Sequence, residues 1–174
     1  LLYDDPDVAS NGMTGVNFRP YFNEPMKSDM ILKKYFEYND LENAHSRYIE
    51  NVKRISNSIE NPIFIPFHKK DKKFANKYLD IPTYPYEFSV EKTLNRVSEV
   101  DRMVATRYHS LVFAAICGKP VLTLAYSPKV RSLADRLSVD SYRPQKRVPL
   151  EFSSVSNVCH LKQKAKKNFS FLIQ

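Results

Sequence analysis

The chain has 174 residues, of which 43% are hydrophobic and 26% charged, a composition typical of one globular domain with a substantial core. No apolar run reaches the roughly 18 residues that a membrane-spanning helix needs. The formal net charge of +8 favours anionic partners, such as phosphates, acidic sugars, anionic lipid or nucleic acid.

Hydrophobic periodicity predicts alternating strands and helices in the first half of the chain. The expected elements are a strand over 14–22, a helix over 39–60, a strand over 63–68, a helix over 69–79 and a small strand over 83–87. Pro20 should end the first strand or place it at an edge, and Pro62 ends the long helix.

The alternation continues in the second half. The expected elements are a helix over 89–100, a strand over 102–107, a helix over 109–117, a strand over 121–126 and a helix over 127–137. Ser89 and Ser127 are predicted helix caps, and Gly118 suits the left-handed residue after a helix. We expect a loop over 139–150 and a final helix from about residue 153.

The later strands are apolar throughout, as in a parallel sheet that helices cover on both faces. The sequence therefore predicts an α/β fold with a doubly wound, mainly parallel, Rossmann-like sheet. A single domain is expected over residues 1–174.

In such a sheet, ligands bind outside the carboxyl ends of the strands. Arg107 and His109 fall where a predicted strand ends and a helix begins. A helix N-terminus attracts anions, an arginine fork fits phosphate or carboxylate, and a histidine transfers protons near neutral pH. The alternative is a structural arginine paired with a carboxylate, beside a histidine that caps the helix.

Three other strand ends carry notable polar residues. Arg19 lies near the end of the first strand, although a lone arginine is more often a surface residue. His68 ends the 63–68 strand, and we interpret the following Asp71 as a helix cap. Lys129 and Arg131 lie in the first turn of a helix, where they oppose the dipole unless an anion binds. Simple solvation of these two long side chains is the alternative.

Several familiar signatures are absent. The four histidines show no metal-ligand spacing, and no P-loop, GxGxxG or GxSxG motif occurs, so no metal or cofactor is expected. Cys117 and Cys159 form no CxxC pair. A reducing, cytoplasmic location is therefore the default.

The segment DRMVATRYHSL over 101–111, followed by GKPV over 118–121 and AYSPKV over 125–130, resembles the polysaccharide pyruvyl transferase family. That family shows Arg-x-His-Ser after an apolar strand, then Pro, an apolar strand and Tyr-x-Pro-Lys-Val. Upstream, VNFR over 16–19 and PFHKKD over 66–71 are similar to the family's strand ending in arginine and its proline–histidine–aspartate segment.

The resemblance implies a glycosyltransferase-B-like architecture with two Rossmann-like halves. This chain would be the C-terminal, donor-holding half of a longer protein, and residues 139–174 would be a weakly matched loop and helix. Family members transfer the enolpyruvyl unit of phosphoenolpyruvate to two hydroxyls of a sugar, which makes a pyruvate ketal and releases phosphate. The product belongs to a cell-surface polysaccharide, such as an exopolysaccharide or a capsule.

The resemblance also assigns roles. Arg19 and Arg107 would hold the carboxylate and phosphate of the donor, His109 would be the acid–base residue, and Lys129 would contact phosphate. Arg107 would also be catalytic, alongside His109, because positive charge near the phosphate would assist its departure. The remaining expected substrate-binding residues are Tyr108, Ser110, Tyr126 and His68. Tyr108 stands where the family more often has an aliphatic residue, and Ser138 where glycine is common.

The expected partners are phosphoenolpyruvate and a sugar or lipid-linked glycan acceptor, with no specific nucleic acid. A cytoplasmic protein is expected, with peripheral contact at the inner face of the membrane left open. One alternative is the sugar-nucleotide-binding half of a glycosyltransferase-B enzyme, although no carboxylate for a ribose follows the 102–107 strand. The other is a non-catalytic anion-binding module, which would need a broad basic surface with interleaved aromatic residues.

Overall fold

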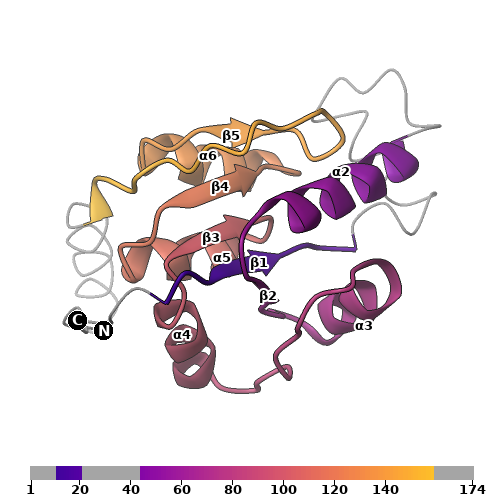
Figure 1. The fold of residues 1–174 in the computed structure, drawn as a ribbon. Coiled ribbons are helices and arrows are strands. Elements are labelled where there is room, and N and C mark those ends of the chain that lie inside the picture. The colour runs from indigo at the N-terminus through magenta and orange to yellow at the C-terminus, as the bar shows by residue number, and fades with distance from the viewer. Residues whose placement is uncertain (1–10, 21–43, 159–174) are drawn as a thin grey trace, which may run out of the picture.

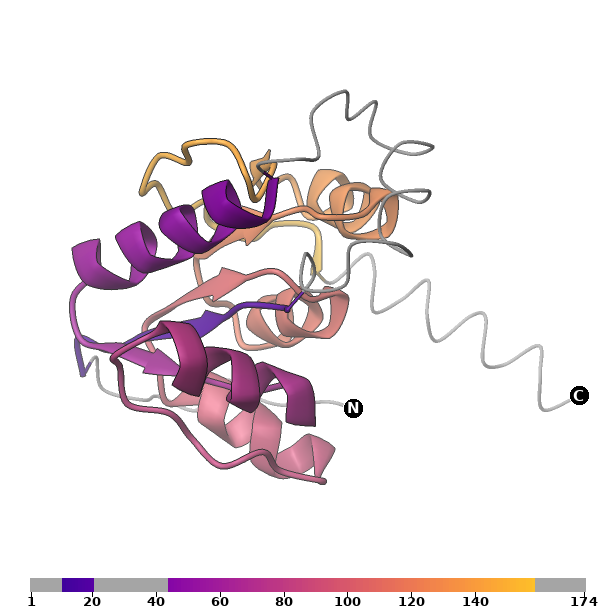
Figure 2. The same cartoon turned by 90° about the vertical axis from the view of Figure 1, so that its right-hand side faces the viewer.

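The computed structural model describes residues 11–20 and 44–158. Within these ranges the chain forms a five-stranded parallel sheet with helices on both faces (Figures 1 and 2). The predicted α/β class with a parallel sheet is confirmed. Within the described ranges, no helix has the length and apolar character needed to span a membrane.

The strands lie in the order β2-β1-β3-β4-β5, so β1 is flanked by β2 and β3. Their bounds are β1 Thr14–Asn17, β2 Pro62–Phe64, β3 Arg102–Ala105, β4 Val121–Leu124 and β5 Ser141–Tyr142. The helices are α2 Ala44–Ser58, α3 Lys69–Tyr78, α4 Val90–Ser98, α5 Tyr108–Ile116 and α6 Pro128–Arg136. All the predicted helices up to residue 137 are therefore present, although residues 39–43 lie outside the described ranges.

The strand predicted over 83–87 is wrong in extent, because only Thr83 pairs, through a single parallel bridge to Phe64. The backbone around it still bonds to β2: Tyr84 N–H donates to the Phe64 carbonyl at 2.9 Å. Counted as a rudimentary strand, this segment is an edge strand next to β2, on the side away from β1. When the strands are then numbered in chain order, they lie in the order 3-2-1-4-5-6, which is that of Rossmann folds.

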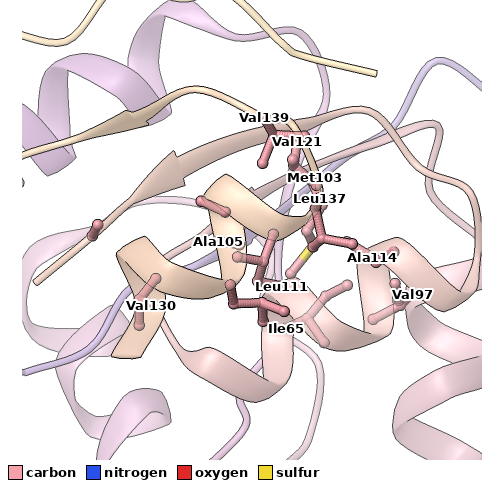
Figure 3. Packing of buried hydrophobic residues seen from close by; sticks show 14 of the residues in the cluster. Ile65, Val97, Met103, Ala105, Leu111, Ala114, Val121, Val130, Leu137 and Val139 are labelled. Carbon is pink, nitrogen blue, oxygen red and sulfur yellow. The ribbon is translucent and has the colours of Figure 1, made fainter. Parts of the chain in front are cut away.

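Two hydrophobic cores hold the helices on the sheet, one on each face. On one face, buried side chains of α2 and α3, such as Tyr48 and Phe74, pack against alternate strand residues, such as Val16 and Val104. On the other face, α4, α5 and α6 enclose a second cluster (Figure 3). Its labelled members include Ile65, Val97, Met103, Leu111, Ala114, Val130 and Leu137. The central strands β3 and β4 are buried from both sides, which is why residues 103–105 and 121–124 are nearly continuous apolar runs.

Gly15 is required by this close packing. A β-carbon at that position would lie 2.7 Å from the Met103 sulfur and 3.0 Å from side-chain carbons of Ile65 and Val100. Such distances are well inside van der Waals contact. The second core can therefore approach β1 only because residue 15 has no side chain.

Most predicted helix ends are confirmed. Ser89 and Ser127 cap α4 and α6 by accepting from the backbone N–H of Lys92 and Val130, at 3.2 and 3.4 Å. Gly118 follows α5 with a φ of 63°, the left-handed conformation that glycine adopts without strain. These features depend on residues within one turn of each other, and so the sequence alone predicts them.

Several predicted boundaries differ. The first strand ends at Asn17 rather than at 22, and residues 21–22 lie outside the described ranges. The strands predicted to end at 68, 107 and 126 end at Phe64, Ala105 and Leu124. The loop predicted over 139–150 contains the short strand β5. The helix predicted from residue 153 is absent up to residue 157, because Ser153 forms an antiparallel bridge with Val121. Residues 159–174 lie outside the described ranges.

Candidate active site at the carboxyl edge of the sheet

The carboxyl ends of the parallel strands bring all the predicted site residues to one edge of the sheet. Arg19 follows β1, and His68 follows β2. The remaining predicted residues follow β3 or β4: Arg107, Tyr108, His109, Ser110, Tyr126 and Lys129. From β1 the chain continues to β2 on one side, whereas β3, β4 and β5 follow on the other side. The direction of the strand order therefore reverses between β1 and β3, which is a topological switch point. Open α/β sheets bind ligands at such a switch point.

Arg107 is held by a buried carboxylate. Its Nε donates to Asp71 Oδ2 at 2.7 Å and its Nη2 to Oδ1 at 2.5 Å, a side-on bidentate pair. The Asp71 side chain is 0% exposed and that of Arg107 is 18% exposed. The alternative of a structural arginine paired with a carboxylate is therefore observed. A substrate-binding role for Arg107 stays a prediction.

Asp71 has further partners, and these connect separate parts of the edge. Its Oδ2 also accepts from the backbone N–H of Phe67 at 3.1 Å and from Asn17 Nδ2 at 3.4 Å. The carboxylate thus connects β1, the segment after β2 and the start of α5. A charge shielded from water needs several such donors to be stable.

The interpretation of Asp71 as a helix cap is wrong. The capping residue of α3 is His68, whose Nδ1 accepts from the backbone N–H of Lys70 at 3.1 Å. Because α3 begins at Lys69, Asp71 lies inside its first turn and points into the protein. His68 is exposed, and its contact with substrate stays a prediction.

The Ser110 side chain forms hydrogen bonds with the backbone of Arg107 at the N-terminus of α5. Its hydroxyl accepts from the Arg107 backbone N–H at 3.1 Å and donates to the Arg107 carbonyl at 2.8 Å. The alternative of His109 as the cap is therefore wrong, because Arg107 occupies the capping position and His109 is exposed in the first turn. The first N–H groups of a helix have no partner within the helix, so this end can receive an anion.

Two further cations at the edge rest on tyrosine rings. The Arg19 guanidinium lies 4.6 Å from the centre of the Tyr126 ring and donates a hydrogen bond to its hydroxyl. Lys129 Nζ lies 4.3 Å from the centre of the Tyr108 ring, and the His109 ring is 5.8 Å from the same ring. Arg19, Arg107 and Lys129, which follow β1, β3 and β4, therefore place three cations at this edge of the sheet, and we call these three residues the cationic cluster.

Tyr48 of α2 also belongs to this region, although nothing in the sequence singled it out as a site residue. Its side chain is 1% exposed and its hydroxyl donates to the Arg19 carbonyl at 2.7 Å. Burial raises the pKa of Tyr48, and the negative charge of Asp71 raises it further, while Arg107 and Arg19 oppose the change. Tyr48 therefore holds the segment after β1 in place as a neutral hydrogen-bond donor.

Asn17 is a second site residue that the sequence did not single out. It is fully buried at the end of β1 and donates to the Ile65 carbonyl at 3.1 Å as well as to Asp71. A polar side chain at the end of a buried strand was the available signal in the sequence. Within the described ranges, no cluster of three histidine, cysteine or acidic side chains could hold a metal ion.

A family model described as Polysaccharide pyruvyl transferase matches residues 11–128. The matched range includes the strand ends after β1, β2 and β3 and stops one residue before Lys129. No curated protein matches the chain.

Proposed function

Because the chain belongs to the polysaccharide pyruvyl transferase family, we propose that it transfers the enolpyruvyl unit of phosphoenolpyruvate to a sugar of a cell-surface polysaccharide precursor. The product is a pyruvate ketal, and phosphate is released. One structural observation supports this proposal beyond the family: Lys129 and the exposed His109 both contact the Tyr108 ring, at the edge of the sheet where Arg19 and Arg107 also lie.

The cluster suits a donor with two anionic groups. Phosphoenolpyruvate carries a carboxylate and a phosphate a short distance apart. Arg19 comes from the segment after β1 and Lys129 from the first turn of α6, both at this edge of the sheet. Arg107 has five N–H donors, of which two bind Asp71. Its pairing with Asp71 orients the guanidinium, so that the remaining donors can bind the substrate without a large loss of side-chain entropy.

The chemistry requires two proton movements. One sugar hydroxyl oxygen bonds to C2 of the enolpyruvyl unit while C3 receives a proton, and a second hydroxyl oxygen then displaces phosphate from C2. Of the two hydroxyl protons, one is balanced by the new C–H bond at C3 and the other leaves with phosphate. We propose that His109 accepts the first hydroxyl proton and supplies one to C3, as general base and acid.

The experiment measures phosphate release from phosphoenolpyruvate by the full-length protein in the presence of glycan acceptors. We expect His109→Ala to lower turnover by about 10²–10⁴-fold, the usual contribution of a positioned acid–base group. Lys129→Ala should raise the KM for phosphoenolpyruvate. The matched control is Lys119→Ala, because Lys119 precedes β4 and lies at the opposite edge of the sheet.

Unchanged turnover in both His109→Ala and Lys129→Ala would contradict the assigned roles. Binding of a nucleotide sugar such as UDP-glucose at the expense of phosphoenolpyruvate would instead support the glycosyltransferase alternative.

A further inference from the structure

His109 also borders a pocket that has no assigned role. The pocket has a volume of about 340 Å³, and its lining includes His109 and Phe113 of α5, Phe67 after β2, and residues of the segment that leads into α4. Small-molecule sites commonly have volumes of about 300–1,000 Å³, so this space suits a small ligand.

The pocket and Lys129 lie on opposite flanks of α5. This helix packs against α6 on one side and α4 on the other (Figure 1). Lys129 comes from α6, whereas Ser89 and Thr93, which line the pocket, belong to the start of α4. His109, in the first turn of α5, therefore stands between the two.

Aromatic rings dominate the pocket. Phe67 and Phe113 meet edge to face with ring centres 5.3 Å apart, and Tyr86 and Phe88 do so at 4.7 Å. Phe88 is 79% exposed, although a phenylalanine loses free energy by facing water, and Lys69 Nζ lies 4.9 Å from the centre of its ring. An exposed ring beside a cavity is a surface on which the apolar face of a ligand can stack.

The polar groups of the lining indicate which ligand fits. Glu87 contributes a carboxylate whose side chain is 20% exposed and whose Oε2 lies 4.0 Å from Nζ of the exposed Lys92. The residues that line the pocket include no lysine or arginine. A carboxylate disfavours the anionic donor and accepts hydrogen bonds from hydroxyls. A sugar ring matches this lining, because its C–H faces are apolar and its hydroxyl edge donates hydrogen bonds.

We propose that this pocket binds the sugar ring of the acceptor, an inference that rests on the proposed function. The sugar stacks on Phe88 and donates a hydroxyl proton in a hydrogen bond to Glu87. Its reacting hydroxyl reaches His109 from the α4 flank, while the donor lies on the α6 flank. One histidine then contacts both substrates, as its role in moving a proton between them requires.

The test measures sugar binding and donor binding separately on the full chain. The sugar probes are methyl β-D-galactopyranoside and methyl β-D-glucopyranoside, followed by saturation-transfer NMR, and phosphoenolpyruvate binding is followed by calorimetry. We expect Phe88→Ala and Glu87→Gln to weaken binding of at least one glycoside by about tenfold, equivalent to about 1.4 kcal/mol. Their affinity for phosphoenolpyruvate should equal that of the wild type.

Phe152→Ala is the matched control, because Phe152 lies against Arg102 at the amino edge of the sheet. It should bind both glycosides as the wild type does. Since Phe88 is exposed, its replacement is not expected to unfold the protein, and circular dichroism checks this.

Equal glycoside binding by the wild type and Phe88→Ala would overturn the inference, as would a wild type that binds phosphoenolpyruvate but neither glycoside. Glycoside binding that depends on Phe88, in a protein that does not bind phosphoenolpyruvate, would support the sugar pocket and contradict the proposed donor instead.

Discussion

At the scale of single residues, Asp71 determines the geometry of the candidate site. It is fully buried, and its two oxygens accept from Arg107, from Asn17 and from the backbone of Phe67. These donors come from segments that are distant in the sequence. The carboxylate therefore fixes the side-on orientation of Arg107 and the place where α5 begins.

Asp71→Asn tests this role. The amide keeps the shape but loses the negative charge, and it presents a donor to groups that need an acceptor. We expect the free energy of unfolding to fall by about 2–3 kcal/mol, measured by urea denaturation. Asp80→Asn, at an exposed position, should change it by less than about 0.5 kcal/mol. Equal losses in the two variants would contradict a structural role for the buried pair.

At the scale of elements, the end of α6 explains an oddity of the sequence. Ser138, at a position where the resemblance implies a glycine, has a φ of 55°. Its N–H donates to Asp135 and that of Val139 to Ala134, both at 3.1 Å, so the left-handed turn satisfies carbonyls at the end of the helix. A serine adopts this conformation only at a cost in free energy.

Ser138→Gly should therefore stabilise the protein. Glycine removes the steric cost but has more freedom in the unfolded chain, so a net gain of about 0.5–1 kcal/mol in the free energy of unfolding is expected. The matched control is Ser132→Gly, at an exposed position inside α6, which should cost about 0.5 kcal/mol. Thermal denaturation compares the two, and a loss of stability in Ser138→Gly would argue against strain at this turn.

At the scale of the whole molecule, the sheet joins residues that are far apart in the chain. Arg19 and Tyr126 contact each other across 107 positions, and Tyr48 of α2 donates to the carbonyl of Arg19. Helices on both faces exclude water from this layer. The stability of the whole fold is thereby linked to the protonation of Tyr48.

Alkaline pH should reveal that link. Because burial raises the pKa of Tyr48, the folded protein retains a proton that the unfolded chain loses near pH 10. The free energy of unfolding should then fall as the pH rises above about 10. Tyr48→Phe should be about 1–2 kcal/mol less stable at pH 8, because the Arg19 carbonyl loses its donor, and should show a shallower decline above pH 10. Parallel curves for the two proteins in urea titrations from pH 8 to 11.5 would contradict this.

The sequence by itself determined the features that depend on near neighbours. Apolar periodicity located the helices and the parallel-sheet class, and Ser89, Ser127 and Gly118 were assigned correctly at helix ends. The same logic placed Arg107 and His109 at a strand–helix junction. All of these follow from hydrogen bonds and burial within one or two turns of the chain.

Only the tertiary structure decided which distant groups meet. The pairing of Asp71 with Arg107, the bond from Tyr48 to Arg19 and the reduction of the 83–87 strand to one bridge depend on packing between separate elements. So does the pocket beside His109, which forms where α5 meets the start of α4. Such contacts leave little trace in local patterns, because their free energy comes from excluding water between segments that the sequence keeps far apart.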